Sequence, residues 1–446
     1  MRNFIIFIKW IFVRAWYMKR AFFIFRDRLL YTKSSRIFYK RAAQRDYEIE
    51  HTRFYNFLGR TLFALKELTA LITDDKIFKK SIILEGYENY DPKRLYKEGD
   101  DRLLWPLSPF VELKKSVVSE DFFKKIENSY KYSVKNDPYL TMNKEKVWEK
   151  HLKEFKEFYF DKNDNLIKER IINFRKEKGS GANILTDHFE VINSEYGYFK
   201  SYLKSLDLIL DFHRFSNFIE PSILQSVSDS YAGEPNLPVY RGQRLSDRII
   251  FLATVISEIK KHLFFDDSKR TCIVDIGGGF GHMGRFTHYY IQNSCYILVE
   301  LSEMSVFGAY FLKYAFNDKK VATIADILDR TDDFESLINE YDFIILPAWA
   351  ISKLPNEFVD LHIATGSIAE MPEHFAQMYL NEIDRTLKFG GYFYTNSRVE
   401  IEKDKPYLYI FYKWKLKSRF LTLSYNYHPV NLIQKTSPQW IGKKVK

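Results

Sequence analysis

The residues with the clearest chemical potential are four glycines that follow an acidic residue near the middle of the 446-residue chain. The segment Val274-Asp275-Ile276-Gly277-Gly278-Gly279-Phe280-Gly281 follows the apolar pattern that starts at Cys272, and a helix-compatible stretch runs from Arg285 to Gln292. Glycines between a strand and a helix let the backbone approach a ligand closely, and the helix N-terminus offers unpaired N–H groups. This order predicts the cofactor-binding loop of a doubly wound α/β sheet.

Three cofactor classes compete for this loop. A phosphate-binding P-loop needs Lys followed by Ser or Thr at its end, where this chain has His282 and Met283. The spacing Gly279-x-Gly281-x-x-Gly284 fits a dinucleotide site, but Asp275 would then face a doubly negative pyrophosphate. S-adenosylmethionine carries an ammonium group that suits this carboxylate, so the pattern Asp275-x-Gly277-x-Gly279-x-Gly281 favours it. A tight turn used only for helix–strand packing is the remaining alternative.

The second predicted strand runs from Cys295 to Val299 and ends at Glu300. A carboxylate at this position, about twenty residues after the glycines, accepts hydrogen bonds from both ribose hydroxyls of a nucleoside cofactor. NAD and S-adenosylmethionine would both use it. A merely solvated acid at a strand end is the alternative interpretation.

Three more predicted strands complete the sheet. The strand over 341–346 ends just before Trp349, whose ring lies either over the adenine or beneath a neighbouring helix. The remaining predicted elements are a strand over 358–363, a helix from Pro372 to near Leu387, a turn over 388–391 and a strand over 392–396. The fold class predicted is therefore a Rossmann-like, doubly wound α/β sheet.

These motifs resemble the sugar O-methyltransferases among the class I S-adenosylmethionine-dependent methyltransferases. The resemblance is carried by Val274 to Gly281, by Glu300 with Leu301, by Thr365-x-Ser367-x-x-Glu370-Met371, and by Gly390-Gly391-Tyr392-Phe393-Tyr394. The upstream segment Gly233-Glu234-Pro235-Asn236 and Gly242 are also similar to that family. The chain departs from it at Ala364, where members usually have Asn, and at Glu300-Leu301-Ser302, where they have Asp-Leu-Pro.

The resemblance implies an enzyme that transfers a methyl group to a hydroxyl of a sugar, in a surface glycan or its lipid-linked precursor. A general base is needed to remove the hydroxyl proton. His282, beside the glycine loop, is the first choice, because imidazole titrates near neutrality; the alternative at a helix start is a capping or packing role. The other candidates are Glu370, His362, and His213 paired with Asp211. No Asp/His cluster has convincing metal spacing, so no metal is predicted.

The chain divides into three predicted parts. Residues 226–446 form the Rossmann-like domain, and residues 46–225 are a mainly helical domain, with helical spacing over 122–132 and 147–160. We expect the helical domain to shape the acceptor site; a purely structural appendage is the alternative. The two cysteines, Cys272 and Cys295, fall in predicted buried strands, so neither a disulfide framework nor a metal site is indicated. This favours the reducing cytoplasm.

The first 45 residues hold most of the basic charge. They contain twelve Lys or Arg and one acidic residue, Asp27, a net charge of +11 on a chain whose total is +10. Lys9, Arg14, Lys19 and Arg20 interrupt every apolar window long enough to span a bilayer. Basic residues mixed with Trp and Phe suit an anionic membrane surface, whereas docking on the helical domain is the alternative. No nucleic-acid-binding motif accompanies the segment.

Two other functions use the same features. An NAD-linked oxidoreductase would keep Glu300 and the glycines, and cofactor binding would distinguish it. A non-catalytic, membrane-associated scaffold would keep the basic arm without needing an intact cofactor site.

Overall fold

The computed structural model describes residues 83–84, 116–138, 146–175, 208, 212, 215, 218–224, 227–235, 237–240, 243–330, 333–397, 413–427 and 438–445. The predictions made for residues 1–45 and for the pair Asp211 and His213 lie outside these residues. No helix within the described ranges is long and apolar enough to cross a bilayer.

The centre of the molecule is an eight-stranded sheet with the order β10-β11-β9-β8-β4-β5-β7-β6. The six strands from β9 to β6 run parallel to one another, and β11 and β10 add antiparallel strands beyond β9. The bounds are β4 (Thr271–Ile276), β5 (Ser294–Glu300), β6 (Val321–Thr323), β7 (Phe343–Pro347), β8 (Val359–Thr365), β9 (Leu387–Asn396), β10 (Phe420–Tyr427) and β11 (Pro438–Lys444).

Both faces of the parallel strands are buried, which explains their nearly continuous apolar sequences. Successive side chains alternate between the faces: Cys272 and Val274 belong to one hydrophobic core and Ile273 to the other. Asp275 therefore points to the same face as Ile273. This alternation places a carboxyl group inside the core, one residue before the end of β4.

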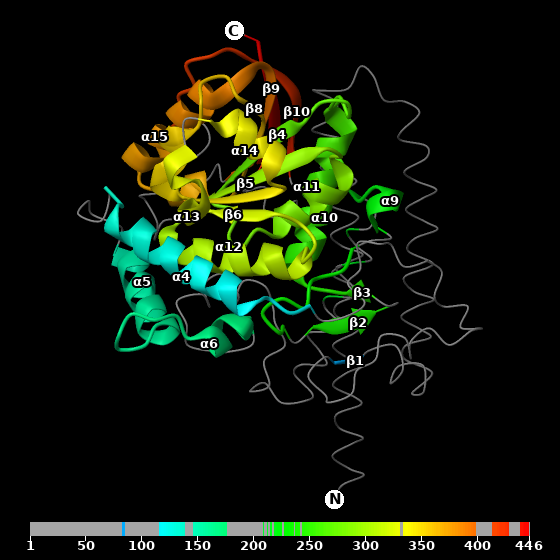
Figure 1. Cartoon of the computed structure of the whole chain (residues 1–446). Helices are drawn as coiled ribbons and strands as arrows, with labels where there is room; N and C mark the ends of the chain where they lie inside the picture. The colour runs from blue at the N-terminus through cyan, green and yellow to red at the C-terminus, as the bar shows by residue number, and fades with distance from the viewer. Residues whose placement is uncertain are drawn as a thin grey trace, which may run out of the picture.

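Helices cover both faces of the sheet (Figure 1). On one face lie α10 (Asp247–His262), α11 (His282–Tyr290) and α12 (Ser302–Ala315), which share a core with Ile273. On the other lie α13 (Ile324–Ile327), α14 (Phe334–Glu340) and α15 (Glu373–Thr386), with the 3₁₀ turns η5 (Ala348–Lys353) and η6 (Ile368–Glu370). A further 3₁₀ turn, η4 (Leu328–Arg330), follows α13.

Three helices from the predicted helical region, drawn in cyan and teal in Figure 1, lie outside α12: the first two pack on α12, and the third packs on the second. They are α4 (Glu120–Lys135), α5 (Lys146–Tyr159) and α6 (Lys168–Ile172). Aromatic rings form the contact: Phe155 meets Phe307 edge to face at 5.4 Å, and Phe174 stacks on Phe307 at 4.8 Å. The helices therefore share one continuous core with the sheet half of the chain.

Short elements connect the helical region to the sheet. Strands β1 (Ile83–Leu84), β2 (Pro238–Tyr240) and β3 (Gln243–Arg244) form a small antiparallel sheet, and α9 (Pro221–Leu224) precedes β2 in the chain.

The five strands predicted from the sequence are present, and the helix predicted after Pro372 is α15. The turn predicted over 388–391 is instead a bulge inside β9. Pairing with β8 steps from Leu387 to Tyr392, and Gly390 takes a φ of 80° that favours glycine. Strand β6, which has only three residues, and the two antiparallel edge strands β10 and β11 were not predicted from the sequence.

Candidate cofactor-binding site

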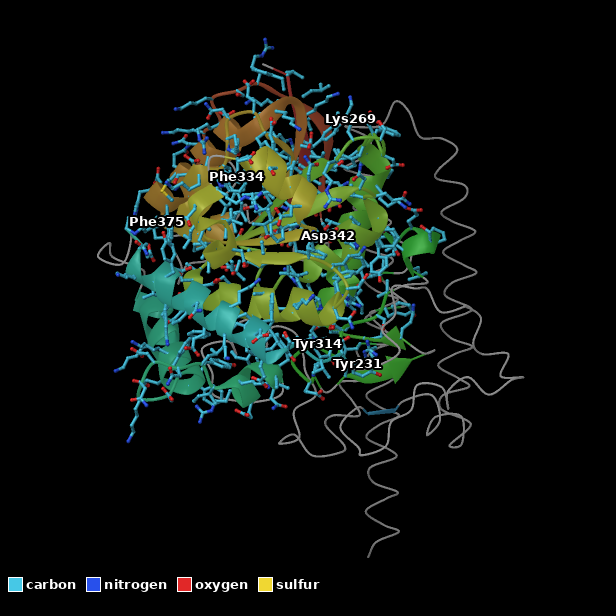
Figure 2. The ribbon with its side chains drawn as sticks, viewed as in Figure 1. Tyr231, Lys269, Tyr314, Phe334, Asp342 and Phe375 are labelled. Carbon is cyan, nitrogen blue, oxygen red and sulfur yellow. The ribbon has the colours of Figure 1, made fainter. Side chains whose placement is uncertain are left out.

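The loops after β4, β5 and β8 meet at the carboxyl edge of the sheet. The chain proceeds from β4 to β5 and β7 on one side, then returns to place β8 on the other side of β4. In doubly wound sheets, ligands bind at this point of reversal. In Figure 2, the labelled Lys269 and Asp342 precede β4 and β7 at the opposite edge, whereas Phe375 follows the β8 loop.

The glycine loop is closely packed at one position and open at another. Gly277, Gly279 and Gly281 have φ values of 68°, 64° and 83°, and residues other than glycine rarely adopt such positive values. A Cβ atom on Gly277 would lie 2.3 Å from the Cβ of Ser367, whereas one on Gly279 or on Gly366 would meet nothing within 4 Å. The space beside Gly279 and Gly366 is the candidate cradle for a cofactor.

Glu300, the last residue of β5, is hydrogen-bonded to this glycine loop. Its carboxylate accepts hydrogen bonds from the N–H groups of Gly279 and Leu301, both at 2.8 Å. Burial raises the pKa of Glu300 to about 7, although these two backbone donors lower it. Each oxygen keeps a free lone pair, so the group can still accept from ligand hydroxyls. The structure thus places Glu300 and Leu301 next to the glycines, as the sequence spacing predicted.

The carboxyl group of Asp275 is fully buried, and only one of its two oxygens has a hydrogen-bond donor among the described residues. Its Oδ2 accepts a hydrogen bond from the hydroxyl of Tyr296 at 2.6 Å, while Oδ1 has no partner among the described residues. Burial raises the pKa of Asp275 to about 6, against the effects of the Tyr296 hydroxyl and of Arg248. Leaving a buried acceptor without a donor costs about 1–3 kcal/mol. This oxygen is suited to a donor supplied by a ligand.

The loop after β8 supplies hydroxyl and carboxylate groups. Thr365 Oγ1 accepts from Arg248 Nη2 at 3.5 Å, and Ser367 Oγ donates to the carbonyl oxygen of Ile276 at 2.6 Å. The second contact ties the β8 loop to the end of β4. Glu370, at the end of η6, is exposed to solvent.

His282 occupies a different environment from the one expected of a general base. The side chain is 1% exposed, and Nε2 lies 2.7 Å from Asp229 Oδ1. Burial lowers the pKa of His282 to about 4, although Asp229 raises it. The neutral ring therefore donates its Nε2 proton to Asp229, and Nδ1, the remaining acceptor, is buried without a partner among the described residues. This environment fits a packing role for His282, the alternative to a general base that the sequence left open.

His362 and Trp349 also lie away from the cradle. His362 is a fully buried residue of β8, with Nε2 2.8 Å from Thr386 Oγ1, and burial lowers its pKa to about 3, so it is not available as a base. Trp349 donates its Nε1 proton to the carbonyl oxygen of Ser133 at 3.2 Å, and its ring lies near Tyr132. The indole thus packs under α4, as the second sequence interpretation proposed.

Sequence analysis missed a buried charge network that anchors the start of α11. Asp229 forms a two-point ion pair with Arg175, at 3.0 and 2.7 Å, and accepts from Ser246 Oγ at 2.5 Å as well as from His282. Burial raises the pKa of Asp229, but Arg175 and His282 outweigh it and hold this pKa well below its usual value. No local motif joins these residues, because 54 positions separate Arg175 from Asp229.

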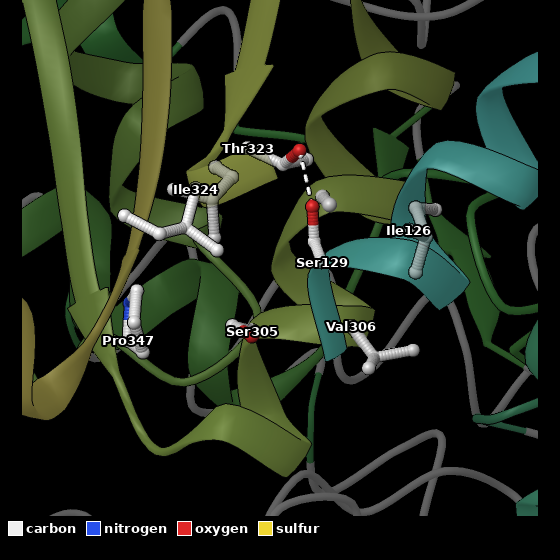
Figure 3. Close-up of a pocket in the computed structure, with 9 residues that line it drawn as sticks. Ile126, Ser129, Ser305, Val306, Thr323, Ile324 and Pro347 are labelled. Carbon is white, nitrogen blue, oxygen red and sulfur yellow. Dashed lines mark hydrogen bonds between the residues drawn. The ribbon is translucent and has the colours of Figure 1, made fainter. Parts of the chain in front are cut away.

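A small recess lies between α4 and α12, near the ends of β6 and β7 (Figure 3). Ser129 donates a hydrogen bond to Thr323 across it at 2.5 Å, and the other lining residues are mostly apolar. Within the described residues, no three His, Cys, Asp or Glu side chains gather as metal ligands would.

No protein-family model matches the chain, and no curated protein is similar to it in sequence. Similar solved structures include the geranyl diphosphate C-methyltransferase of Streptomyces coelicolor A3(2), crystallised with S-adenosyl-L-homocysteine. Its identity is 12% and its TM-score 0.33, over 45% of this chain and 78% of that one.

The 1,6-didemethyltoxoflavin-N1-methyltransferase of Burkholderia thailandensis, also crystallised with S-adenosylhomocysteine, matches with 14% identity and a TM-score of 0.29, over 44% and 79% of the two chains. The [4+2]-cyclase SpnF matches with 13% identity and a TM-score of 0.29, over 43% and 82%. Similarities this distant assign neither a cofactor nor a reaction to this chain.

The strand order and the glycine loop define the class on their own. The chain is a Rossmann-like, doubly wound α/β protein with an added antiparallel edge, which confirms the fold predicted from the sequence.

Proposed function

We propose that the protein is an S-adenosylmethionine-dependent O-methyltransferase that acts on a sugar hydroxyl. The observation that carries the proposal is the buried Oδ1 of Asp275, which has no partner among the described residues and belongs to the residue two positions before the glycine loop with the open side at Gly279. An ammonium donor would satisfy this oxygen, and Glu300 is placed to accept from ribose hydroxyls. The residues present therefore fit a nucleoside that carries an amino acid.

A pyrophosphate fits the same space less well. Asp275, two positions before the first glycine, would face its two negative charges across a short distance, whereas Glu300 would serve the ribose of either cofactor. This favours S-adenosylmethionine over NAD and makes the NAD-linked oxidoreductase the second candidate. The pKa values of about 6 and about 7 mean that a cationic, hydroxyl-rich ligand would also stabilise the ionised forms of these acids.

The bound cofactor would supply a methyl group already activated on a sulfonium. The task left to the chain is to hold the acceptor oxygen in line with that methyl and to take the hydroxyl proton. Glu370 is the base we propose, because it follows the β8 loop that borders the cradle and is exposed, whereas His282 and His362 are buried. His213 lies outside the described residues and remains an alternative.

The acceptor and the cellular site belong to the same proposal. The resemblance of the Thr365-to-Met371 segment to sugar O-methyltransferases supports a sugar hydroxyl in a surface glycan or its lipid-linked precursor. We propose that the helical region shapes the acceptor site and that residues 1–45 hold the enzyme at the cytoplasmic face of a membrane. The scaffold alternative keeps this arm but gives no role to the half-satisfied Asp275.

The first experiment is isothermal titration of the full chain with S-adenosylhomocysteine, S-adenosylmethionine and NAD. We expect binding of the first two and none of NAD. Binding of NAD alone would replace the proposal with the oxidoreductase, and binding of no nucleoside would favour the scaffold.

A further inference from the structure

Arg248 lies at the carboxyl edge of the sheet although it comes from a helix that precedes β4. Helix α10 runs back along the sheet before β4 begins, so its first turn lies beside the ends of β4 and β8. Ser246 caps this turn by accepting from the N–H of Ile249 at 3.1 Å, and it also donates to the buried Asp229. The start of α10, and with it the backbone of Arg248, is thus fixed in place.

The charges around Arg248 are those of the candidate site. Its Nη2 lies 3.5 Å from Thr365 Oγ1 in the β8 loop. Burial lowers the pKa of Arg248, while the nearby Asp275, Tyr296 and Glu370 raise it. The guanidinium is therefore partly withdrawn from water. Its partner Thr365 lies two residues beyond Ile363, which pairs with Asp275 across β8 and β4. A cation and an anion from different elements thus lie at neighbouring strand ends on the same edge of the sheet.

This pairing matches the amino-acid end of the proposed cofactor. An α-amino acid carries an ammonium and a carboxylate on the same carbon, so a complementary site needs an acidic and a basic group a few ångströms apart. Asp275, with its unpartnered Oδ1, provides the acidic group. The planar guanidinium of an arginine can donate two parallel hydrogen bonds to a carboxylate.

We propose that Arg248 binds the α-carboxylate of the methionine part of the cofactor, opposite the Asp275 that receives the ammonium. This assignment rests on the proposed function, because it presumes S-adenosylmethionine as the ligand. It gives the site a direction: the amino-acid end lies towards the first turn of α10, and the ribose lies towards Glu300.

The test compares two ligands that differ only at the amino-acid end. S-adenosylhomocysteine carries both charged groups, whereas 5′-methylthioadenosine keeps the adenosine and the thioether and lacks them. For Arg248→Gln, we expect the affinity for S-adenosylhomocysteine to fall about ten-fold or more and that for 5′-methylthioadenosine to stay unchanged. Titration calorimetry measures both without any need for turnover.

Two further variants separate this role from a structural one. Arg248→Lys keeps the charge but loses the forked geometry. It should therefore lose part of the affinity for S-adenosylhomocysteine and keep the full affinity for 5′-methylthioadenosine. Lys269→Gln removes one positive charge from the opposite edge of the sheet and should change neither affinity. Thermal unfolding checks that each variant is folded; should Arg248→Gln fail to fold, Arg248→Lys carries the comparison.

The possible outcomes separate the two proposals. An equal loss for both ligands, or no loss for either, would overturn the role of Arg248 while the wild-type binding still supports the cofactor. Failure of the wild-type protein to bind either ligand would remove the cofactor proposal and the inference together.

Discussion

The carboxylate of Glu300 is joined to the N–H of Gly279 by a hydrogen bond of 2.8 Å, across 21 positions of sequence. This bond fastens the glycine loop after β4 to the end of β5, while β8, to which the chain later returns, lies on the other side of β4. It also holds a buried acid next to open space beside Gly279. The position of the loop and the charge that the site offers to a ligand thus depend on the same side chain.

Replacing Glu300 tests this relationship. Glu300→Ala should weaken binding of S-adenosylhomocysteine about ten-fold or more, since a charge-assisted contact to the ribose is worth about 1.5–3 kcal/mol. Isothermal titration measures it, with Glu335→Gln on the exposed face of α14 as the control. Unchanged affinity in a folded Glu300→Ala protein would remove Glu300 from the site.

The affinity for S-adenosylhomocysteine should depend on pH. Without ligand, the pKa is about 7 for Glu300 and about 6 for Asp275, and the ligand binds their ionised forms. We expect the dissociation constant to rise about ten-fold or more between pH 8 and pH 6, with proton release on binding near pH 6.5. Titrations in two buffers of different ionisation enthalpy detect the protons, and an affinity independent of pH would contradict this assignment.

The same shifts predict an effect on stability. Because both folded-state pKa values lie above those of the unfolded chain, these acids contribute stability at low pH that is lost as the pH rises through about 6 and 7. A bound ligand supplies hydrogen-bond donors to the ionised carboxylates of Asp275 and Glu300. The gain in unfolding temperature on adding S-adenosylhomocysteine should therefore be larger at pH 8 than at pH 6.

His282 should act on stability rather than on turnover. Its folded-state pKa of about 4 lies below the unfolded value, so it contributes stability above pH 6.5 that is lost as the pH falls towards 4. His282→Ala should destabilise the protein by about 1–3 kcal/mol at pH 7.5, because the buried Asp229 loses a donor. Urea unfolding at pH 7.5 and pH 5 measures this.

Two variants decide between this role and that of a general base. His282→Gln, which keeps an N–H donor, should recover part of the stability and should not change turnover. A folded His282→Gln protein that has lost 10²-fold or more of its turnover would instead return His282 to the reaction.

The sequence predicted the five longer parallel strands because both faces of each are buried, which leaves an apolar run such as Cys295 to Val299 with an acid at its end. It also predicted the proximity of Asp275, Gly279 and Glu300, since carboxyl ends of parallel strands share one edge. It could not predict that His282 faces Asp229, or that Arg248 reaches the edge. Both depend on how α10 and the segment after α9 pack, and no local pattern encodes that packing.

Glu370 is the residue whose loss should affect the chemical step. Glu370→Gln should lower turnover 10²- to 10⁴-fold on a sugar acceptor while the affinity for S-adenosylhomocysteine stays the same. The matched control is Glu373→Gln, three residues further along in the first turn of α15 and also exposed. Turnover equal to the wild-type rate would place the base elsewhere, and His213 would be the next variant.

The basic arm should confer membrane binding. Residues 1–45 carry a net charge of +11 and several Trp and Phe side chains, on a chain that is otherwise close to neutral. Basic side chains attract anionic lipid in a salt-sensitive manner, whereas buried aromatic rings add a component that salt does not screen. Vesicle sedimentation of the full chain and of a chain starting at Asp46, at low and high salt, separates these effects. We expect only the full chain to pellet, more with anionic than with neutral vesicles and partly at high salt; equal pelleting of both chains would assign the arm to packing on the helical region.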